Sequence, residues 1–95
     1  MAAYLIADLD VTEPGTYEEY RRQVGPLLEQ YGARILIRGG AIKVLESEWE
    51  PKRLILLEFP DMDTLKGFYD SDDYKGPKEL RQRAAVSKVL AVQGA

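Results

Sequence analysis

Two of the residue types that most often carry chemistry in proteins, cysteine and histidine, are absent from this chain. Without cysteine there is no disulfide, thiol nucleophile, iron–sulfur cluster or thiolate zinc site. Without histidine the commonest general base, metal ligand and proximal haem ligand are missing. Only carboxylates, phenols, guanidinium groups and amines remain for chemistry, so we expect neither a metal site nor a cofactor.

The chain also lacks a strong charge excess and a long apolar run. Its net charge is −3, which argues against a nucleic-acid surface, because such a surface needs clustered basic residues. No stretch approaches the roughly 18 apolar residues of a membrane-spanning helix, and no signal-peptide pattern precedes the first strand. The expectation is a cytoplasmic protein with no nucleic-acid or membrane partner. Its 95 residues predict one domain spanning residues 1–95.

Hydrophobic periodicity predicts alternating strands and helices. Apolar residues alternate in the first strand, whereas the third is almost continuously apolar, which indicates burial on both faces. The expected strands are residues 4–11, 34–38 with a short extension at 41–45, 53–59 and 88–93, and the expected helical regions are residues 14–31 and 62–86. This order is the split βαβ pattern, so we predict an α+β, ferredoxin-like βαββαβ fold with an antiparallel sheet of order 4-1-3-2 and both helical regions on one face.

Capping and breaking residues predict where the helices begin and where they are interrupted. Thr12, Asp61 and Ser71 are typical N-caps. The pairs Gly25–Pro26 and Gly76–Pro77 lie inside the helical regions. Because proline cannot donate a backbone hydrogen bond to the residue four positions back, we expect each pair to kink or interrupt its helix.

The face of the sheet away from the helices is expected to carry large aliphatic side chains. In the first three strands one parity is almost wholly apolar and is assigned to the helix-covered face. The other set of alternate residues places Ile6, Leu36, Leu54 and Leu56 on the open face. In the fourth strand either set of alternate residues could face the helices. Such a patch favours a homodimer through the open sheet face. The alternative is a weakly hydrophobic face that stays in contact with water.

Three charged residues are predicted to share that open face: Asp8, Arg38 and Glu58. Carboxylates beside an arginine in a partly dry cavity have separated pKa values, an arrangement suited to acid–base catalysis. The alternative is an ion-pair cluster that satisfies the charges and fixes the register of the strands.

Aromatic and glycine residues supply further candidate ligand contacts. Tyr20 lies on the apolar stripe of the first helix, so core packing with the hydroxyl at the edge is the alternative to a binding role. Tyr69 and Tyr74 flank an acidic turn that starts at Ser71, where they could close one end of a cavity.

A second group of candidates lies after the second strand. Arg38 beside Gly39 and Gly40 offers a guanidinium group next to a flexible backbone that could hold a carboxylate, although a Gly-Gly pair is also typical of a plain bulge. Trp49, on an acidic connection, could pack over the rim of the sheet or over a partner subunit.

Several motifs occur along the chain in a characteristic order. They are the strand at residues 4–11 followed by Thr12, then Tyr17-x-x-Tyr20, Tyr31-Gly32, Arg38-Gly39-Gly40, Glu46, Trp49-x-Pro51-x-Arg53, Glu58-Phe59-Pro60 and Tyr69-x-Ser71-x-x-Tyr74. Together they resemble the bacterial family called domain of unknown function 1330, over about Ala3 to Gln93. The resemblance implies the dimeric α/β-barrel superfamily, whose ferredoxin-like sheets pack face to face.

The resemblance implies no single activity. Superfamily relatives include cofactor-free monooxygenases, muconolactone isomerases and haem-degrading enzymes, and the missing histidine removes a residue that the monooxygenase and haem branches favour. The Gly76–Pro77 pair departs from the unbroken helix expected of the family.

Two functions therefore stay open. The first is a dimeric protein that binds a small carboxylated or aromatic metabolite between sheet and helices. The alternative is a cofactor-independent enzyme, monooxygenase- or isomerase-like, in which Asp8 or Glu58 moves a proton, Arg38 holds an anion, and Tyr20 or Tyr69 orients the substrate.

Overall fold

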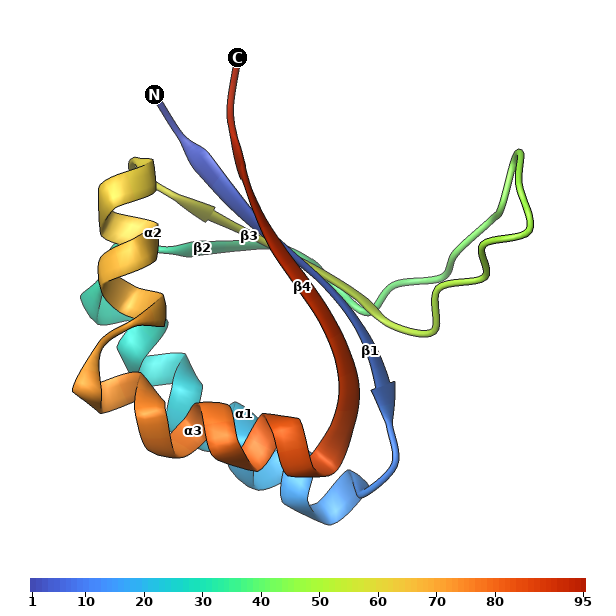
Figure 1. Cartoon of the computed structure of the whole chain (residues 1–95), viewed down its shortest axis with the longest axis horizontal. Coiled ribbons are helices and arrows are strands. Elements are labelled where there is room, and N and C mark those ends of the chain that lie inside the picture. Colours follow the sequence, from blue (N-terminus) through green and yellow to red (C-terminus); the bar gives the residue numbers. More distant parts are fainter.

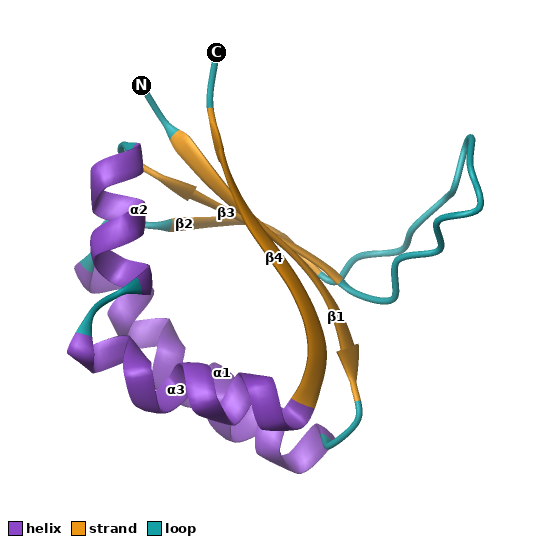
Figure 2. Ribbon diagram, viewed as in Figure 1, coloured by secondary structure: helices purple, strands orange, loops and turns teal.

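A four-stranded antiparallel sheet, with three helices on one of its faces, makes up the computed structural model of this chain, which describes residues 1–95 (Figures 1 and 2). The elements are β1 (Ala3–Val11), α1 (Pro14–Gln30), β2 (Arg34–Arg38), β3 (Leu54–Phe59), α2 (Met62–Tyr69), α3 (Asp72–Ala84) and β4 (Ala85–Gln93). The strand order β2-β3-β1-β4 is the predicted 4-1-3-2 order, counted from the opposite edge. The ferredoxin-like α+β fold is confirmed.

The helix-covered face carries the core. Leu5, Ala7 and Leu9 of β1 are nearly inaccessible to solvent, as are Leu57 and Phe59 of β3. The intervening residues of both strands are half-buried, apart from the exposed Asp10. Against them pack Leu65 and Phe68 from α2 together with side chains from α1 and α3. The buried hydrophobic residues are Ala3, Leu5, Ala7, Leu9, Tyr17, Val24, Leu28, Leu57, Phe59, Leu65, Phe68, Tyr74, Ala84 and Ala85.

Two of the three predicted helix caps are confirmed. Asp61 accepts a hydrogen bond from the Thr64 backbone N–H (2.7 Å), and the Ser71 hydroxyl accepts one from the Tyr74 N–H (3.1 Å). The prediction for Thr12 was wrong, because its hydroxyl donates instead to the carbonyl of Ala84 (3.2 Å). Thr12 therefore ties the start of α1 to the end of α3.

Each Gly-Pro pair was predicted to kink or interrupt its helix, and the interruption was wrong. Pro26 lies inside a continuous α1 and Pro77 inside a continuous α3. The carbonyls that lose their partners belong to Arg22 and Asp73, two exposed residues, so water can satisfy them at little cost. The helix expected of the family is therefore unbroken, and it ends at Ala84 because Ala85 already has extended backbone angles (φ −151, ψ 143).

The segment between β2 and β3 also differs from the prediction. Residues 39–53 form neither strand nor helix, so the extension expected at 41–45 is wrong. This segment extends away from the helices beyond one end of the sheet (Figure 1), where no neighbouring strand is available for pairing. The bulge expected at the glycine pair lies instead within β2, between Ile35 and Ile37.

The open face of the sheet is now defined on all four strands. Leu90 pairs with Ile6 and Val92 with Tyr4, which settles the parity of β4, because directly opposed residues of antiparallel strands point to the same side. Leu90 and Val92 are 54% and 42% exposed. The chain thus presents an apolar sheet face with no cover of its own. No helix in it is both long enough and apolar enough to cross a membrane.

Candidate functional site

The bulge in β2 separates Arg38 from the two carboxylates expected beside it. Leu36 is the extra residue, and beyond it Arg38 pairs with Ile55. Ile55 has the parity of the helix-covered face, so Arg38 projects to the helix side, whereas Asp8 and Glu58 project from the open face. The predicted grouping of these three residues was wrong, because an inserted residue reverses the alternation on which it depended.

Asp8 holds the long β2–β3 connection at its base. Its carboxylate accepts one hydrogen bond from the Trp49 indole N–H (3.2 Å) and another from the Lys52 backbone N–H (3.1 Å). Asp8 and Trp49, both candidate site residues, are therefore brought together. Their contact fixes a loop against the open face.

Glu58 has its own partners on the open face. It accepts a hydrogen bond from the Tyr4 hydroxyl (3.2 Å) and forms an ion pair with Arg34 (3.4 Å) on the neighbouring strand. Both partners lie directly opposite Glu58 in the register. These contacts favour the alternative in which the charges fix the register of the strands.

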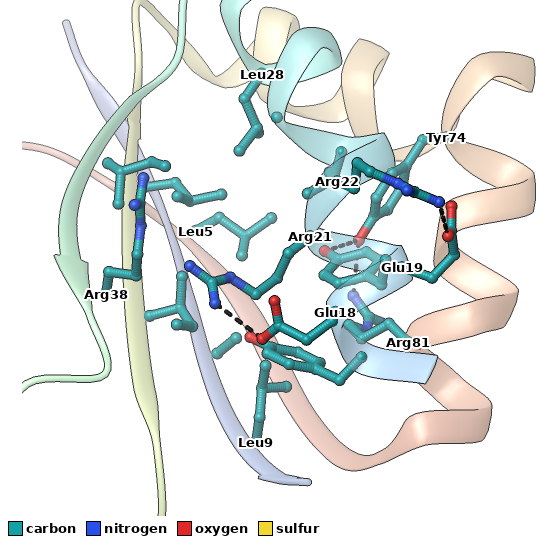
Figure 3. Close-up of a pocket in the computed structure, with 18 of the residues that line it drawn as sticks. Leu5, Leu9, Glu18, Glu19, Arg21, Arg22, Leu28, Arg38, Tyr74 and Arg81 are labelled. Carbon is teal, nitrogen blue, oxygen red and sulfur yellow. Dashed lines mark hydrogen bonds and ion pairs between the residues drawn. The ribbon is translucent and has the colours of Figure 1, made fainter. Parts of the chain in front are cut away.

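A cavity of about 570 Å³ lies between the sheet and α1 (Figure 3). Twelve of its 20 lining residues are hydrophobic. Exposed residues at its margin include Arg21, Arg22 and Arg38. Its volume is in the range of small-molecule pockets, which combine apolar walls with a few polar groups. The lining residues are Leu5, Ala7, Leu9, Gly15, Tyr17, Glu18, Glu19, Tyr20, Arg21, Arg22, Val24, Gly25, Leu28, Ile35, Arg38, Ile55, Leu57, Phe68, Tyr74 and Arg81.

Three tyrosines and one arginine form a polar cluster at this cavity: Tyr20, Tyr69, Tyr74 and Arg81, here called the tyrosine–arginine cluster. The Tyr20 and Tyr74 hydroxyls are 3.0 Å apart and share a hydrogen bond. Arg81 donates to the Tyr74 hydroxyl (3.0 Å) and to the Tyr69 hydroxyl (3.4 Å). Of the four, Tyr20, Tyr74 and Arg81 line the cavity, and Figure 3 labels Tyr74 and Arg81.

Arg81 is buried with no carboxylate beside it. The side chain is 4% exposed, none of the ion pairs in the molecule includes it, and its Nε has no hydrogen-bond partner. A guanidinium group stays protonated in proteins, so a positive charge is held in the core by phenols alone. Buried charges are normally paired, because an uncompensated one destabilises the fold by several kcal/mol.

Burial also alters the two phenols that share the hydrogen bond. Burial, with the neighbouring Tyr74 phenol, raises the pKa of Tyr20 far above its usual value. Burial likewise raises the pKa of Tyr74, against the opposing effect of Arg81. Both hydroxyls therefore stay protonated and act as hydrogen-bond donors throughout the physiological range.

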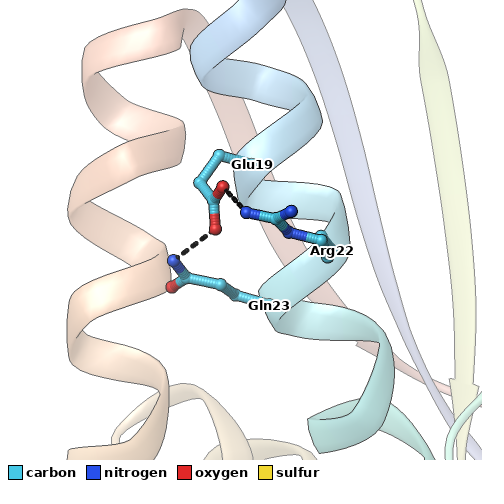
Figure 4. A network of polar contacts seen from close by, with 3 residues as sticks. All are labelled: Glu19, Arg22 and Gln23. Carbon is cyan, nitrogen blue, oxygen red and sulfur yellow. Dashed lines mark hydrogen bonds and ion pairs between the residues drawn. The ribbon is translucent and has the colours of Figure 1, made fainter.

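A second polar group lies on the exposed side of α1 (Figure 4). Glu19 accepts hydrogen bonds from Gln23 (2.8 Å) and from Arg22. The hydrogen bond from Gln23 is the largest effect that lowers the pKa of Glu19. These i, i+3 and i, i+4 contacts stabilise the helix, so Arg22 is not free to serve the cavity.

The other candidate residues have diverse placements. Ser71 caps α3, so its hydroxyl is already engaged. Gly39 has φ +65 and lies against the Arg53 side chain, where a Cβ would come within 3.1 Å of Cγ; Gly40 has open space around it. No group of three or more His, Cys, Asp or Glu residues that could hold a metal ion is present.

Arg81 was missed by the sequence analysis. It lies seven residues after Tyr74, two turns along the same helix, so both face one side of α3. That spacing was the available signal. It was overlooked because the Gly76–Pro77 pair was expected to interrupt the helix between them.

The fold and the cavity define the class: a ferredoxin-like α+β protein with a helix-side pocket and an uncovered sheet. The chain belongs to the family described as a domain of unknown function, DUF1330, whose model matches residues 2–95. The resemblance drawn from its motifs is confirmed. No curated protein matches the chain in sequence.

Solved structures share the fold at low sequence identity. A protein of unknown function, RPA0582 from Rhodopseudomonas palustris, is 17% identical with a TM-score of 0.79, over 99% of this chain and 82% of that one. A dimeric ferredoxin-like protein of unknown function from Jannaschia sp. CCS1 is 13% identical with a TM-score of 0.71, over 99% and 100%. SnoaB, a cofactor-independent oxygenase from Streptomyces nogalater, is 9% identical with a TM-score of 0.63, over 99% and 93%. At these identities the likeness shows the fold alone.

Proposed function

We propose that this protein is a homodimer that binds a small carboxylated or aromatic metabolite in the cavity between its sheet and α1. The observation that carries the proposal is the combination of a 570 Å³ space with a buried arginine that has no carboxylate partner. Apolar walls favour a flat hydrocarbon body, and a positive charge held nearby favours an acid group.

The arrangement expected for the alternative enzyme does not support a second proposal. Arg38 lies on the helix side, whereas Asp8 and Glu58 lie on the open face. Each carboxylate is also engaged by partners on neighbouring strands or in the β2–β3 connection. An anion held by Arg38 would therefore be separated from both proposed proton carriers by the sheet.

The dimer part of the proposal rests on the open face. Large aliphatic side chains on it are exposed in the single chain, which is a patch that soluble monomers seldom leave uncovered. A second copy supplies a matching surface through a two-fold axis, because the same face can pair with itself. The dimeric state of the Jannaschia protein agrees with this proposal.

Ligand binding is tested with a panel of benzoate, phenylacetate, benzyl alcohol and acetate, followed by NMR titration and by thermal unfolding. We expect the aromatic members to bind and to raise the unfolding temperature, because a ligand that binds only the native state stabilises it. Acetate, which cannot fill the apolar part, is expected to bind more weakly.

A matched pair of variants localises the binding. Gly15 lines the cavity and Gly67 of α2 does not, and a Cβ added at either would meet no atom within 4 Å. Gly15→Phe should weaken binding of the aromatic ligands, and Gly67→Phe should leave it unchanged. The proposal fails if no panel member binds at millimolar concentration, or if the two variants behave alike.

A further inference from the structure

Hydrogen-bond donors outnumber acceptors in the tyrosine–arginine cluster. Arg81 supplies five N–H groups and no acceptor, and each of the three phenols adds one O–H. The acceptors in the cluster are the three phenol oxygens. The Arg81 Nε already lacks a partner. A buried donor without an acceptor costs about 1–3 kcal/mol, so the cluster is short of an oxygen that accepts.

At the cavity, the missing hydrogen-bond acceptor concerns the hydroxyls of Tyr20 and Tyr74. Tyr74 accepts from Arg81 (3.0 Å) and shares a hydrogen bond with Tyr20 (3.0 Å). Whichever of the two phenols donates in that bond, the other retains an O–H with no acceptor in the protein. Tyr74 is 2% exposed, whereas Tyr20 is only half-buried. An acceptor arriving in the cavity therefore meets Tyr20 first, with Tyr74 turned to donate toward Tyr20.

We propose that the tyrosine–arginine cluster recognises the acid group of an aromatic carboxylate, with the Tyr20 hydroxyl donating to the carboxylate and Arg81 acting through Tyr74. The inference rests on the cavity being a ligand site and adds the class of ligand and its orientation. Hydrogen bonds in a chain polarise one another in a low dielectric, so the arginine charge strengthens the donor that the ligand contacts. Arg81 is a positioning residue here, because its guanidinium group donates to the Tyr74 and Tyr69 hydroxyls and acts on the ligand through Tyr74.

The aromatic part of the ligand follows from the walls around Tyr20. The ring of Tyr17 lies 5.8 Å from that of Tyr20, centroid to centroid, and the two rings line the cavity with aliphatic residues of β1 and β3. Flat rings pack well in such surroundings. A second hollow of about 480 Å³, which Arg81 also lines, has only four hydrophobic residues among nine, so its wall is less suited to an aromatic ring.

The test compares benzoate with benzamide, which has the same shape and no charge, at neutral pH by calorimetry or NMR titration. We expect the wild-type protein to bind benzoate at least tenfold more tightly. Tyr20→Phe should reduce that preference about tenfold or more, since a hydrogen bond to a charged group is being removed. Tyr31→Phe is the matched control, because Tyr31 does not line the cavity and its hydroxyl forms no hydrogen bond, so its loss should leave the preference intact. Intermolecular NOEs from benzoate to the Tyr20 ring in the wild-type protein give a readout that does not depend on a variant folding.

Several results overturn the inference. Equal binding of benzoate and benzamide, or an undiminished preference in Tyr20→Phe, would remove the acid-recognition role while leaving the cavity as a ligand site. If Arg38→Gln abolishes the preference for benzoate over benzamide instead, the carboxylate binds at the cavity margin. If Tyr69→Phe abolishes it, the carboxylate binds in the second hollow. If neither compound nor any member of the earlier panel binds, the proposed function fails as well.

Discussion

The Arg81 guanidinium and the Tyr74 hydroxyl, two turns apart on α3, meet at 3.0 Å in the core with no carboxylate beside them. Tyr20 and Tyr69 complete the surroundings of this charge. A fold seldom retains a buried cation in the company of phenols alone, because apolar residues of similar size are often more stabilising. The proposed ligand site depends on this buried charge.

The first prediction concerns the effect of the buried Arg81 charge on the free energy of unfolding. Arg81→Met should raise the free energy of unfolding by about 1 kcal/mol, because a buried unpaired charge is replaced by a flexible apolar side chain. Urea unfolding measures the change. Arg83→Met, at an exposed position in the last turn of the same helix, should change stability by less than about 0.5 kcal/mol. A large loss of stability in Arg81→Met alone would mean that the hydrogen bonds to the phenols outweigh the desolvation.

The second prediction concerns alkaline pH. Burial raises the pKa of both Tyr20 and Tyr74 above the ordinary tyrosine value of 10.0. Above that value the unfolded chain loses these protons while the native protein keeps them, so the native state binds more protons and stability falls as pH rises. The contribution of these two hydroxyls to the free energy of unfolding is fully present below about pH 10. Above that pH it declines by up to about 1.4 kcal/mol per pH unit for each group.

Urea unfolding between pH 9 and 11 tests this slope. Lysines titrate in the same range, so the relevant quantity is the difference between wild-type protein and Tyr20→Phe. The variant should show a shallower decline. Parallel curves for the two proteins would contradict the prediction.

The third prediction concerns the open face. Leu90 lies in the middle of β4 opposite Ile6 and is 54% exposed in the single chain. Leu90→Glu should convert a dimer to a monomer, because the interface would then bury like charges from both copies. Analytical ultracentrifugation at micromolar concentration measures it. Gln82→Glu, an exposed change on the helix side, is the control, and a wild-type protein that sediments as a monomer would refute the proposed pairing.

The fourth prediction concerns the anchor of the β2–β3 connection. Asp8→Ala removes the acceptor for the Trp49 indole N–H and the Lys52 N–H, so it should lower the free energy of unfolding by about 1 kcal/mol. It should also lower the fluorescence anisotropy of Trp49, the only tryptophan in the chain. Asp10→Ala, two residues along the same strand and face, makes none of these contacts and should change neither quantity.

The candidate site was only partly predictable. Tyr20 was recognised on the apolar stripe of the first helix and Tyr74 beside the turn that starts at Ser71, and both belong to the tyrosine–arginine cluster. Arg81 was not recognised, because a pattern-based reading assigned an interruption to Pro77 that the helix does not have. Glu58 and Asp8 were correctly placed on the open face, but only the fold showed that strand and loop partners already occupy them.

The sequence by itself determined the fold class and the helix-covered face. The alternating apolar residues of β1, the nearly continuous apolar run of β3, the caps at Asp61 and Ser71, and the order of elements each follow from local periodicity and backbone hydrogen bonding, which residues near in sequence decide. The tertiary structure alone decided where Arg38 points and what surrounds Arg81. A single inserted residue, Leu36, reverses the side chains that follow it, and an arginine on α3 meets Tyr20 of α1 through Tyr74 only after the two helices pack together. Contacts of that kind depend on the register and docking of distant segments, which no local pattern encodes.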